Sequence, residues 1–277
     1  MTPVVAAVTV VHGRHDHLRR QQRGLDAGTR GPDVRCVVAM DDDAVAGLLP
    51  ADADVSALPR EGGALPLARA RNLGAEMALR RGADLLVFLD VDCIPDPDLV
   101  ARYADAHRAT DRPALLAGPV TYLPAGAAER ALTDPASCRR PHPGRPDPPD
   151  GVLLHGGDPD LFWSLSFAAS RATWQRIGGF CEDYVGYGGE DTDFAAVATQ
   201  RGVGLCWVGG AHAYHQHHPV SDPPTEHLAD IVANARVFRR RWGRWPMPTW
   251  LNAFEERGLL VRDGDDVHVT TPDEVTA

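Results

Sequence analysis

Two aspartates one residue apart follow the most strongly apolar short segment of the chain. Asp90 and Asp92 come directly after residues 85–89 (LLVFL), a run that predicts a buried strand. Alternate residues of a strand point to one side, so both carboxylates would face the same space and repel each other. A divalent cation would relieve that repulsion, and hard oxygen ligands suit Mg²⁺ or Mn²⁺. The plain alternative is a solvated acidic turn.

A second acidic cluster lies at the predicted start of a helix. Gly188 and Gly189 allow the backbone to approach a ligand closely, and Glu190, Asp191 and Asp193 follow them. The dipole of a helix favours ionised carboxylates at its N-terminus. An ionised carboxylate that faces a cavity can act as a general base. Because acidic residues also cap helices, the cluster indicates either chemistry or capping.

Histidines are concentrated in one short segment. His212, His215, His217 and His218 fall within seven residues, directly after a predicted strand at 204–208. Imidazole is the commonest side-chain ligand of metals in proteins. One or two of these rings could share a site with Asp90 and Asp92, and the alternative is a surface loop that happens to be rich in histidine.

Further polar residues stand where the ligands of open α/β sheets bind, beyond the carboxyl ends of the strands. Asp41, Asp42 and Asp43 follow a predicted strand at 34–40. They fall at the same kind of strand end as Asp90.

The helix predicted over 66–81 carries Arg69, Arg71 and Asn72. Arginine can hold a diphosphate through two parallel hydrogen bonds. The same three residues would also suit an ordinary solvated helix face.

Strands and helices alternate over the first 120 residues. Apolar β-branched runs predict strands at 4–11, 34–40, 54–58, 85–89 and 115–123. Helical patterns, with Pro66 and Pro97 in first turns, predict helices at 15–25, 66–81 and 96–108. This alternation predicts an α/β fold with a mostly parallel central sheet flanked by helices.

The rest of the chain is less regular. Residues 124–160 are dense in Pro and Gly and lose hydrophobic periodicity, which predicts a loop or a lid. Order returns at 161–169, and the later predictions are helices at 170–178, 191–201 and 226–242 and a strand at 204–208. The acidic residues 263–277 predict a frayed polar tail.

Composition excludes several classes of protein. The net charge of -10 argues against nucleic acid as the main partner. All 28 basic residues are Arg, so lysine Schiff bases and a P-loop lysine are excluded. The arginines of residues 236–244 alternate with aromatic residues, and we interpret them as the solvated face of a helix whose aromatic residues pack inward.

Thiols and apolar segments bear on location. The five cysteines are odd in number and no two have CxxC spacing, which favours reduced thiols. No signal peptide is evident, and no segment approaches the ~18 apolar residues of a membrane span. We therefore expect a cytoplasmic protein without a transmembrane segment.

Taken in order, these segments resemble family-2-type glycosyltransferases of the GT-A fold, which is a Rossmann-like fold for nucleotide-diphospho-sugar transferases. VTVVHGRHDHL resembles the first strand and turn, and LARARNLGAEMALRRGADLLVFLDVDCIPDPDLV resembles the Arg-Asn helix and DxD motif. RATWQRIGGFCEDYVGYGGEDTDFAAVATQRG resembles the C-terminal part of β-1,4-galactosyltransferases and chondroitin-polymerase-type transferases, and AHAYHQHHP resembles the metal-ligand histidine segment of the latter.

The resemblance implies a role for each matched residue. Asp92 would bind the metal, and Asp90 would bind the nucleotide ribose or the metal shell. His215 would be the third protein ligand, with His217 as the competing choice. Asp191 would be the general base, and Glu190 would orient the acceptor. The implied donor-binding residues are Asp41, Asp43, Arg69, Arg71, Asn72, Asp90, Val91, Tyr187, Gly188 and Gly189, with Tyr187 standing where the galactosyltransferases carry Trp.

The resemblance also implies the organisation of the chain. Residues 1–262 would form one GT-A domain, in which 1–123 bind the nucleotide sugar. Residues 124–160 would form the loop or lid, 161–262 the acceptor-binding half with a C-terminal helix, and 263–277 the tail.

We therefore predict an inverting, Mn²⁺- or Mg²⁺-dependent glycosyltransferase. UDP is favoured as the donor nucleotide by resemblance alone, and the acceptor (glycan, lipid, small metabolite or peptide) stays open. Two alternatives are a metal-dependent hydrolase or nucleotidyltransferase that uses the same Asp and His cluster, and a non-catalytic protein that binds sugar nucleotides.

Overall fold

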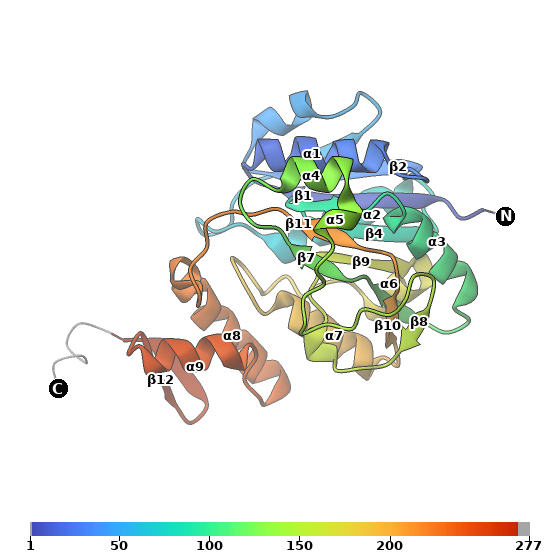
Figure 1. The fold of residues 1–277 in the computed structure, drawn as a ribbon. Coiled ribbons are helices and arrows are strands. Elements are labelled where there is room, and N and C mark those ends of the chain that lie inside the picture. The colour runs from blue at the N-terminus through green and yellow to red at the C-terminus, as the bar shows by residue number, and fades with distance from the viewer. Residues whose placement is uncertain (1, 271–277) are drawn as a thin grey trace.

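An eight-stranded sheet forms the centre of the computed structural model, which describes residues 2–270 (Figure 1). Its strand order is β3-β2-β1-β4-β9-β6-β10-β8. The strands, in chain order, are β1 (Val5–Val11), β2 (Val34–Met40), β3 (Asp54–Leu58), β4 (Leu85–Leu89), β6 (Ala114–Ala117), β8 (Leu153–His155), β9 (Ser166–Ser170) and β10 (Gly204–Val208). Neighbouring strands are parallel, except that β9 is antiparallel to β4 and β6 and that β8 is antiparallel to β10. The predicted α/β fold with a mostly parallel sheet is confirmed.

Helices cover both faces of this sheet, as the continuous apolar strands require. The helices of the body are α1 (His15–Asp26), α2 (Leu67–Arg80), α3 (Leu99–Ala109), α6 (Arg171–Ile177) and α7 (Glu190–Gln200). Buried residues of α2, α6 and α7 pack on one face, and buried residues of α1 and α3 pack on the other. Gly74 of α2 lies so close to β1 that an added Cβ would stand 2.4 Å from Val8 Cγ1. This close packing fixes α2, which carries Arg71, against the sheet.

A second, smaller sheet lies at the edge where β1, β2 and β4 end. It consists of β5 (Cys93–Pro95), β11 (Ala213–His215) and β7 (Val120–Tyr122), in the order β5-β11-β7. Its register pairs His215 with Cys93 on one side and with Tyr122 on the other. The small sheet therefore brings the histidine segment beside the residue that follows Asp92.

Two elements predicted in the first 123 residues differ from the structure. The predicted strand 115–123 is divided between β6 and β7, because Gly118 passes so close to Ala211 O that a Cβ there would lie at 1.8 Å, and Pro119 cannot donate to a ladder. The helix predicted from residue 96 begins at Leu99, since residues 93–95 pair with β11 instead.

The segment 124–160 is not an unstructured loop. It contains α4 (Ala128–Thr133), α5 (Pro135–Cys138) and β8, whose pairing with β10 makes it an edge strand of the main sheet. A short strand in a Pro-rich segment carries little periodicity, which is why the sequence did not reveal it.

The C-terminal elements form a separate group below one end of the sheet (Figure 1). They are α8 (Leu228–Trp242), α9 (Pro248–Glu256) and a hairpin of β12 (Leu260–Asp263) and β13 (Asp266–Val269), which share a buried apolar cluster. The tail prediction is therefore wrong for 263–269, where β13 pairs with β12, while 271–277 lie outside the described residues. The prediction of helix 226–242 is correct to within two residues, whereas α9 was not predicted.

The remaining short elements are the 3₁₀ helices η1 (Asp43–Leu48), η2 (Pro159–Leu161) and η3 (Thr225–His227). Among the helices of residues 2–270, none combines the length and the apolar character that crossing a membrane requires. All five cysteines are free thiols.

Candidate active site

One buried arginine connects the two acidic motifs of the sequence. Arg71, on the second turn of α2, donates from Nη2 to Asp90 Oδ1 at 3.1 Å and from Nη1 to Glu190 Oε1 at 3.0 Å. Both Arg71 and Glu190 are buried. Burial raises the pKa of the Asp90 carboxyl, and the charge of Arg71 opposes that rise. The motifs, a hundred residues apart in the chain, therefore belong to one site.

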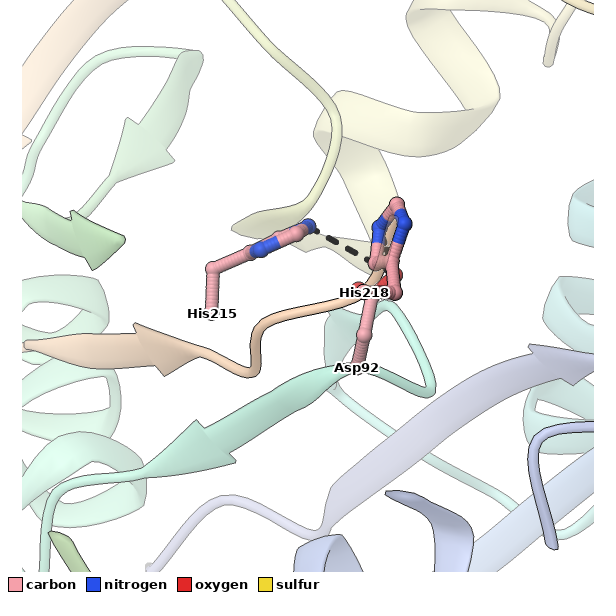
Figure 2. Close-up of side chains that lie close together, drawn as sticks. All are labelled: Asp92, His215 and His218. Atoms are coloured by element: carbon pink, nitrogen blue, oxygen red, sulfur yellow. Dashed lines mark ion pairs between the residues drawn. The ribbon is translucent and has the colours of Figure 1, made fainter. Parts of the chain in front are cut away.

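Asp92 faces two histidines. Its Oδ2 lies 3.5 Å from His215 Nε2 and 3.6 Å from His218 Nε2. Figure 2 shows His215 at the end of β11, His218 on the segment that follows it, and Asp92 on the turn before β5. Candidate ligand atoms of the three residues all lie within 4.8 Å of one another.

This donor set fits a divalent cation. Two ligands that each stand ~2.0–2.2 Å from one ion are separated by about 3–3.5 Å, close to the carboxylate–imidazole spacing found here. The carboxylate oxygen suits Mn²⁺ or Mg²⁺, and imidazole is a common ligand of transition-metal ions, so the mixed set is compatible with Mn²⁺. Burial lowers the pKa of His218, which favours the neutral ring that a metal requires. Arg14, in a left-handed conformation at the start of α1, also contacts Asp92 Oδ2, so an ion would compete with its guanidinium.

The structure distributes the predicted metal ligands differently from the sequence proposal. Asp90 lies outside the cluster and contacts Arg71, because residues 90–92 form a turn and do not continue β4. His217 is exposed, and His218 stands beside Asp92 in its place. Val91 is buried in an apolar cluster between β1, β2 and α1.

The start of α7 holds the candidate base. Gly188 and Gly189 both have a φ of 91°, which glycine adopts without strain, and they turn the chain sharply into the helix. Burial and the nearby Glu190 raise the pKa of Asp191 to about 7. Its Oδ1 accepts from the amide of Thr192 at 2.7 Å. The second carboxylate oxygen of Glu190 is buried and has no hydrogen-bond partner within residues 2–270.

Asp193, in the same motif, has a different environment. Its carboxylate is fully buried and accepts from Tyr184 Oη at 3.2 Å, Arg241 Nε at 2.7 Å and Trp242 Nε1 at 2.7 Å. It therefore anchors α8 to α7. Arg241 makes this structural contact while its side chain stays exposed, as the interpretation of a solvated face expects.

Two other residues of the Arg-Asn helix do not reach the site. Asn72 donates to Phe180 O at 2.9 Å and accepts from Phe180 N at 2.8 Å, which fixes the Gly178-Gly179 turn. Arg69 is exposed, 3.8 Å from Glu61.

The aspartates after β2 also divide their roles. Asp42 accepts from Gly13 N at 2.7 Å, contacts His15 at 2.8 Å and caps η1. Asp41 is exposed and pairs with Arg60 at 2.7 Å, and Asp43 is exposed at the start of η1. The sequence proposal favoured Asp41 and Asp43, while Asp42 is the one tied to the loop after β1.

Tyr187 lies in an aromatic stack before the glycine pair. Its ring stacks on His227 with centroids 4.4 Å apart and faces Trp250 at 5.8 Å. Neither His227 nor Trp250 was singled out by the sequence, and neither was Arg14. The turn into α1 that positions Arg14 gives no recognisable signal in one sequence.

Comparisons with known proteins agree with this geometry. Residues 160–219, which include the Gly188-Gly189 turn, α7 and the histidine segment, match the family model described as the N-terminal domain of galactosyltransferase. The fold matches the crystal structure of GalNAc-T7 with UDP, GalNAc and Mn²⁺, with a TM-score of 0.56 and 15% identity. The match covers 92% of this chain and 54% of the other, so this chain corresponds to about half of that protein's length. No curated protein matches the chain. Residues 160–219 therefore resemble a galactosyltransferase domain, and the chain as a whole shares the fold of GalNAc-T7.

Proposed function

We propose that this protein transfers a sugar from a nucleoside-diphosphate sugar, with UDP as the favoured nucleotide, to an acceptor hydroxyl in a single inverting, metal-dependent displacement. The observation that carries the proposal is a candidate cation-binding cluster (Asp92, His215 and His218) in the same site as a carboxyl of raised pKa (Asp191). Arg71 connects the two motifs through their neighbouring residues Asp90 and Glu190. UDP and Mn²⁺ are also the nucleotide and the metal in the GalNAc-T7 structure.

Asp92, His215 and His218 would hold Mn²⁺ or Mg²⁺, with His217 as a less favoured ligand because its ring is exposed. A bound cation would supply Lewis-acid stabilisation of the departing diphosphate. Asp90 would bind the nucleotide ribose, since Arg71 holds its carboxylate just outside the cluster. Arg71 is fully engaged by Asp90 and Glu190, so its role would be to position these two carboxylates.

The nucleotide would lie over the ends of β1, β2 and β4, near Asp41, Asp42 and Asp43. Asp42 is the best supported of the three, because it orders the backbone at Gly13. Gly13 is followed by Arg14, which contacts the cluster residue Asp92. Arg14 would pass from Asp92 to a phosphate oxygen when the donor binds; its side chain is more than one third exposed.

Asp191 would act as the general base. As the acceptor hydroxyl attacks the anomeric carbon from the face opposite the diphosphate, Asp191 takes the hydroxyl proton, the bond to the diphosphate oxygen breaks, and the diphosphate leaves with the electron pair. A base with a pKa of about 7 is well matched to proton transfer at neutral pH. The unpartnered oxygen of Glu190 would accept a hydrogen bond from the acceptor.

The test is release of UDP from a panel of UDP-sugars, with Mn²⁺ or with EDTA, for the wild type and for Asp92→Ala. We expect release from one donor that requires the metal and is lost in the variant, because slow hydrolysis of the donor needs no acceptor. Asp98→Ala, a half-exposed change on the same segment and outside the cluster, is the matched control. The stereochemistry of the product, read by NMR of the anomeric proton, tests the inverting step separately. If no sugar nucleotide binds in calorimetry with Mn²⁺ present, the proposal is wrong.

A further inference from the structure

A single arginine is buried without a partner close to this site. Arg145, in the Pro-rich segment, is 5% exposed, and none of its three guanidinium nitrogens has a hydrogen-bond partner among residues 2–270. Its charge lies against two aromatic faces, 5.0 Å from the ring centroid of Trp207 and 5.2 Å from that of Trp163. Every nitrogen of the fork therefore lacks a hydrogen-bond acceptor in the part of the chain that the structure describes.

This arrangement is costly unless a ligand completes it. Burial lowers the pKa of Arg145, yet a guanidinium keeps its proton at neutral pH. Contacts with two aromatic faces offset only part of the lost hydration of a buried cation. Buried charges in folded proteins are normally paired and hydrogen-bonded, so an unpaired one near an active site points to a substrate group.

A chain of ring contacts connects Arg145 with the cation-binding cluster. The Trp163 ring lies 5.0 Å from His142, His142 lies 5.6 Å from Tyr122, and Tyr122 lies 4.6 Å from the cluster residue His215. Tyr122 is 47% exposed, so this series of rings has one end at the surface and the other at the buried Arg145 guanidinium. The carboxyl of Asp191 also acts electrostatically on Arg145.

The position of Arg145 separates it from the donor's phosphates. Asp90 and Asp92 follow β4, whereas Trp207 belongs to β10, three strands further along the sheet. A diphosphate held at Asp92 would extend towards β1 and β4, whereas Arg145 lies against Trp207 of β10 and is linked to His215 only through the rings of Trp163, His142 and Tyr122. The side of Arg145 is the one from which an acceptor would approach Asp191.

We propose that Arg145 recognises a carboxylate or a phosphate on the acceptor, so that this enzyme glycosylates an acidic acceptor. The planar fork of arginine binds either oxyanion through two parallel hydrogen bonds. The walls formed by Trp163 and Tyr122 would pack on the rest of the acceptor. That the bound oxyanion belongs to the acceptor rests on the proposed function, whereas the preference of Arg145 for an oxyanion does not.

The experiment compares matched pairs of probes that differ by one charge. Methyl β-glucuronide is compared with methyl β-glucoside, and glucose 6-phosphate with glucose, by saturation-transfer NMR and calorimetry, on the full chain with UDP and Mn²⁺ and again without them. We expect the wild type to bind at least one charged probe about tenfold or more tightly than its neutral partner, as a charge-assisted pair should. Arg145→Gln should reduce that ratio to about one, and Arg145→Lys should retain part of it.

Arg140→Gln is the matched control, because Arg140 carries the same charge on the same segment but is exposed. It should leave the preference unchanged. Thermal unfolding is followed in parallel. Since the Arg145 guanidinium makes no hydrogen bond within residues 2–270, Arg145→Gln should fold. A charged probe should raise the melting temperature of the wild type but not that of Arg145→Gln.

Three results would overturn the inference. One is a wild type with no preference for charged probes, and another is a preference that persists in Arg145→Gln. The third is a loss of UDP affinity in Arg145→Gln as large as the loss for the probe, which would assign Arg145 to the donor diphosphate. Failure of the proposed function is recognised separately, as absence of UDP-sugar binding in a wild type that still prefers charged probes.

Discussion

The two acidic motifs have similar composition but treat their carboxylates in opposite ways. In the turn after β4, Asp92 faces the histidines from outside the main sheet, and Asp90 is held by Arg71. In α7, Asp191 is left with a raised pKa near the site, whereas Asp193, two residues later, is fully buried under α8 with three donors.

This difference shows how neighbouring carboxylates acquire separate roles. The oxygens of Asp193 are saturated by donors of the scaffold, so its charge contributes to stability. Asp191 has the Thr192 amide and hydroxyl as its donors, so its charge remains costly and available for chemistry. Arg71 fixes the two motifs relative to each other, because it is a buried cation that pairs with a carboxylate of each.

The largest expected effect separates Asp191 from Asp193. Asp191→Asn should lower the rate of sugar transfer by about 10²–10⁴-fold, the usual contribution of a general base. The folded protein disfavours the ionised carboxylate, so replacing it should stabilise the fold at pH 8. The melting temperature of Asp191→Asn should exceed that of the wild type by about 2–4 °C for each kcal/mol of stability gained. Asp193→Asn should instead lose about 1–3 kcal/mol of stability and keep its rate per folded molecule. If Asp191→Asn and Asp193→Asn changed the rate and the melting temperature in the same way, the separate roles of the two carboxylates would be wrong.

Arg71 tests the connection between the motifs. Arg71→Met should lower the free energy of unfolding by about 3–5 kcal/mol, because it leaves Asp90 and Glu190 buried without their cation. Urea denaturation measures the change. Arg69→Met, on the exposed side of the same helix, should stay within about 0.5 kcal/mol of the wild type. Equal effects of the two substitutions would contradict the role given to Arg71.

Substitutions in the histidine segment test which ring binds a metal together with Asp92. His218→Ala should weaken Mn²⁺ binding by at least the ~10–100-fold that loss of a ligand's supporting partner typically costs. His217→Ala should leave the affinity unchanged, since its ring is exposed. Calorimetry with Mn²⁺ alone measures both. The reverse order would restore His217 as the ligand.

The smallest effect is the pH dependence that Asp191 imposes. Its raised pKa means that the base is protonated and inactive below about 7 and ionised above it. The rate of transfer should therefore rise by about tenfold from pH 6 to pH 8. Stability should change in the opposite sense, falling as pH rises from the ordinary aspartate pKa of 3.8 towards 7, because the folded state binds the proton more tightly. A profile that is flat over this interval would argue against Asp191 as the base.

Much of the fold could be predicted from the sequence because its strands are continuously apolar. The runs that became β1, β2 and β4 are buried on both faces of the sheet, and glycine and proline mark the ends of α2 and α6. The elements that were missed or misjudged are short or pair with distant strands. β8, β11 and the β12–β13 hairpin have three or four residues each, too few for a periodic pattern.

The candidate site could be predicted only in part. Strand ends and residue types singled out Asp92, His215, Glu190 and Asp191, all of which lie in or beside the site. The same reasoning included Asn72 and Arg69, whose side chains point away from the site. Placing a residue on a helix does not tell which of its side chains will face a segment that is distant in the sequence. Nothing in the sequence distinguished Arg145 from other arginines.

The sequence by itself determined the local order of strands and helices and the positions of carboxylates and imidazoles at strand ends, since these follow from apolar runs and turn residues that act over a few neighbours. Tertiary structure decided which charges meet. The pairing of β11 with β5 selected His215 and His218 for Asp92, α8 covered Asp193, and two tryptophans enclosed Arg145. Those outcomes depend on burial and on contacts between residues that lie from 18 positions apart (Arg145 and Trp163) to 126 positions apart (Asp92 and His218), and no short pattern in the chain encodes them.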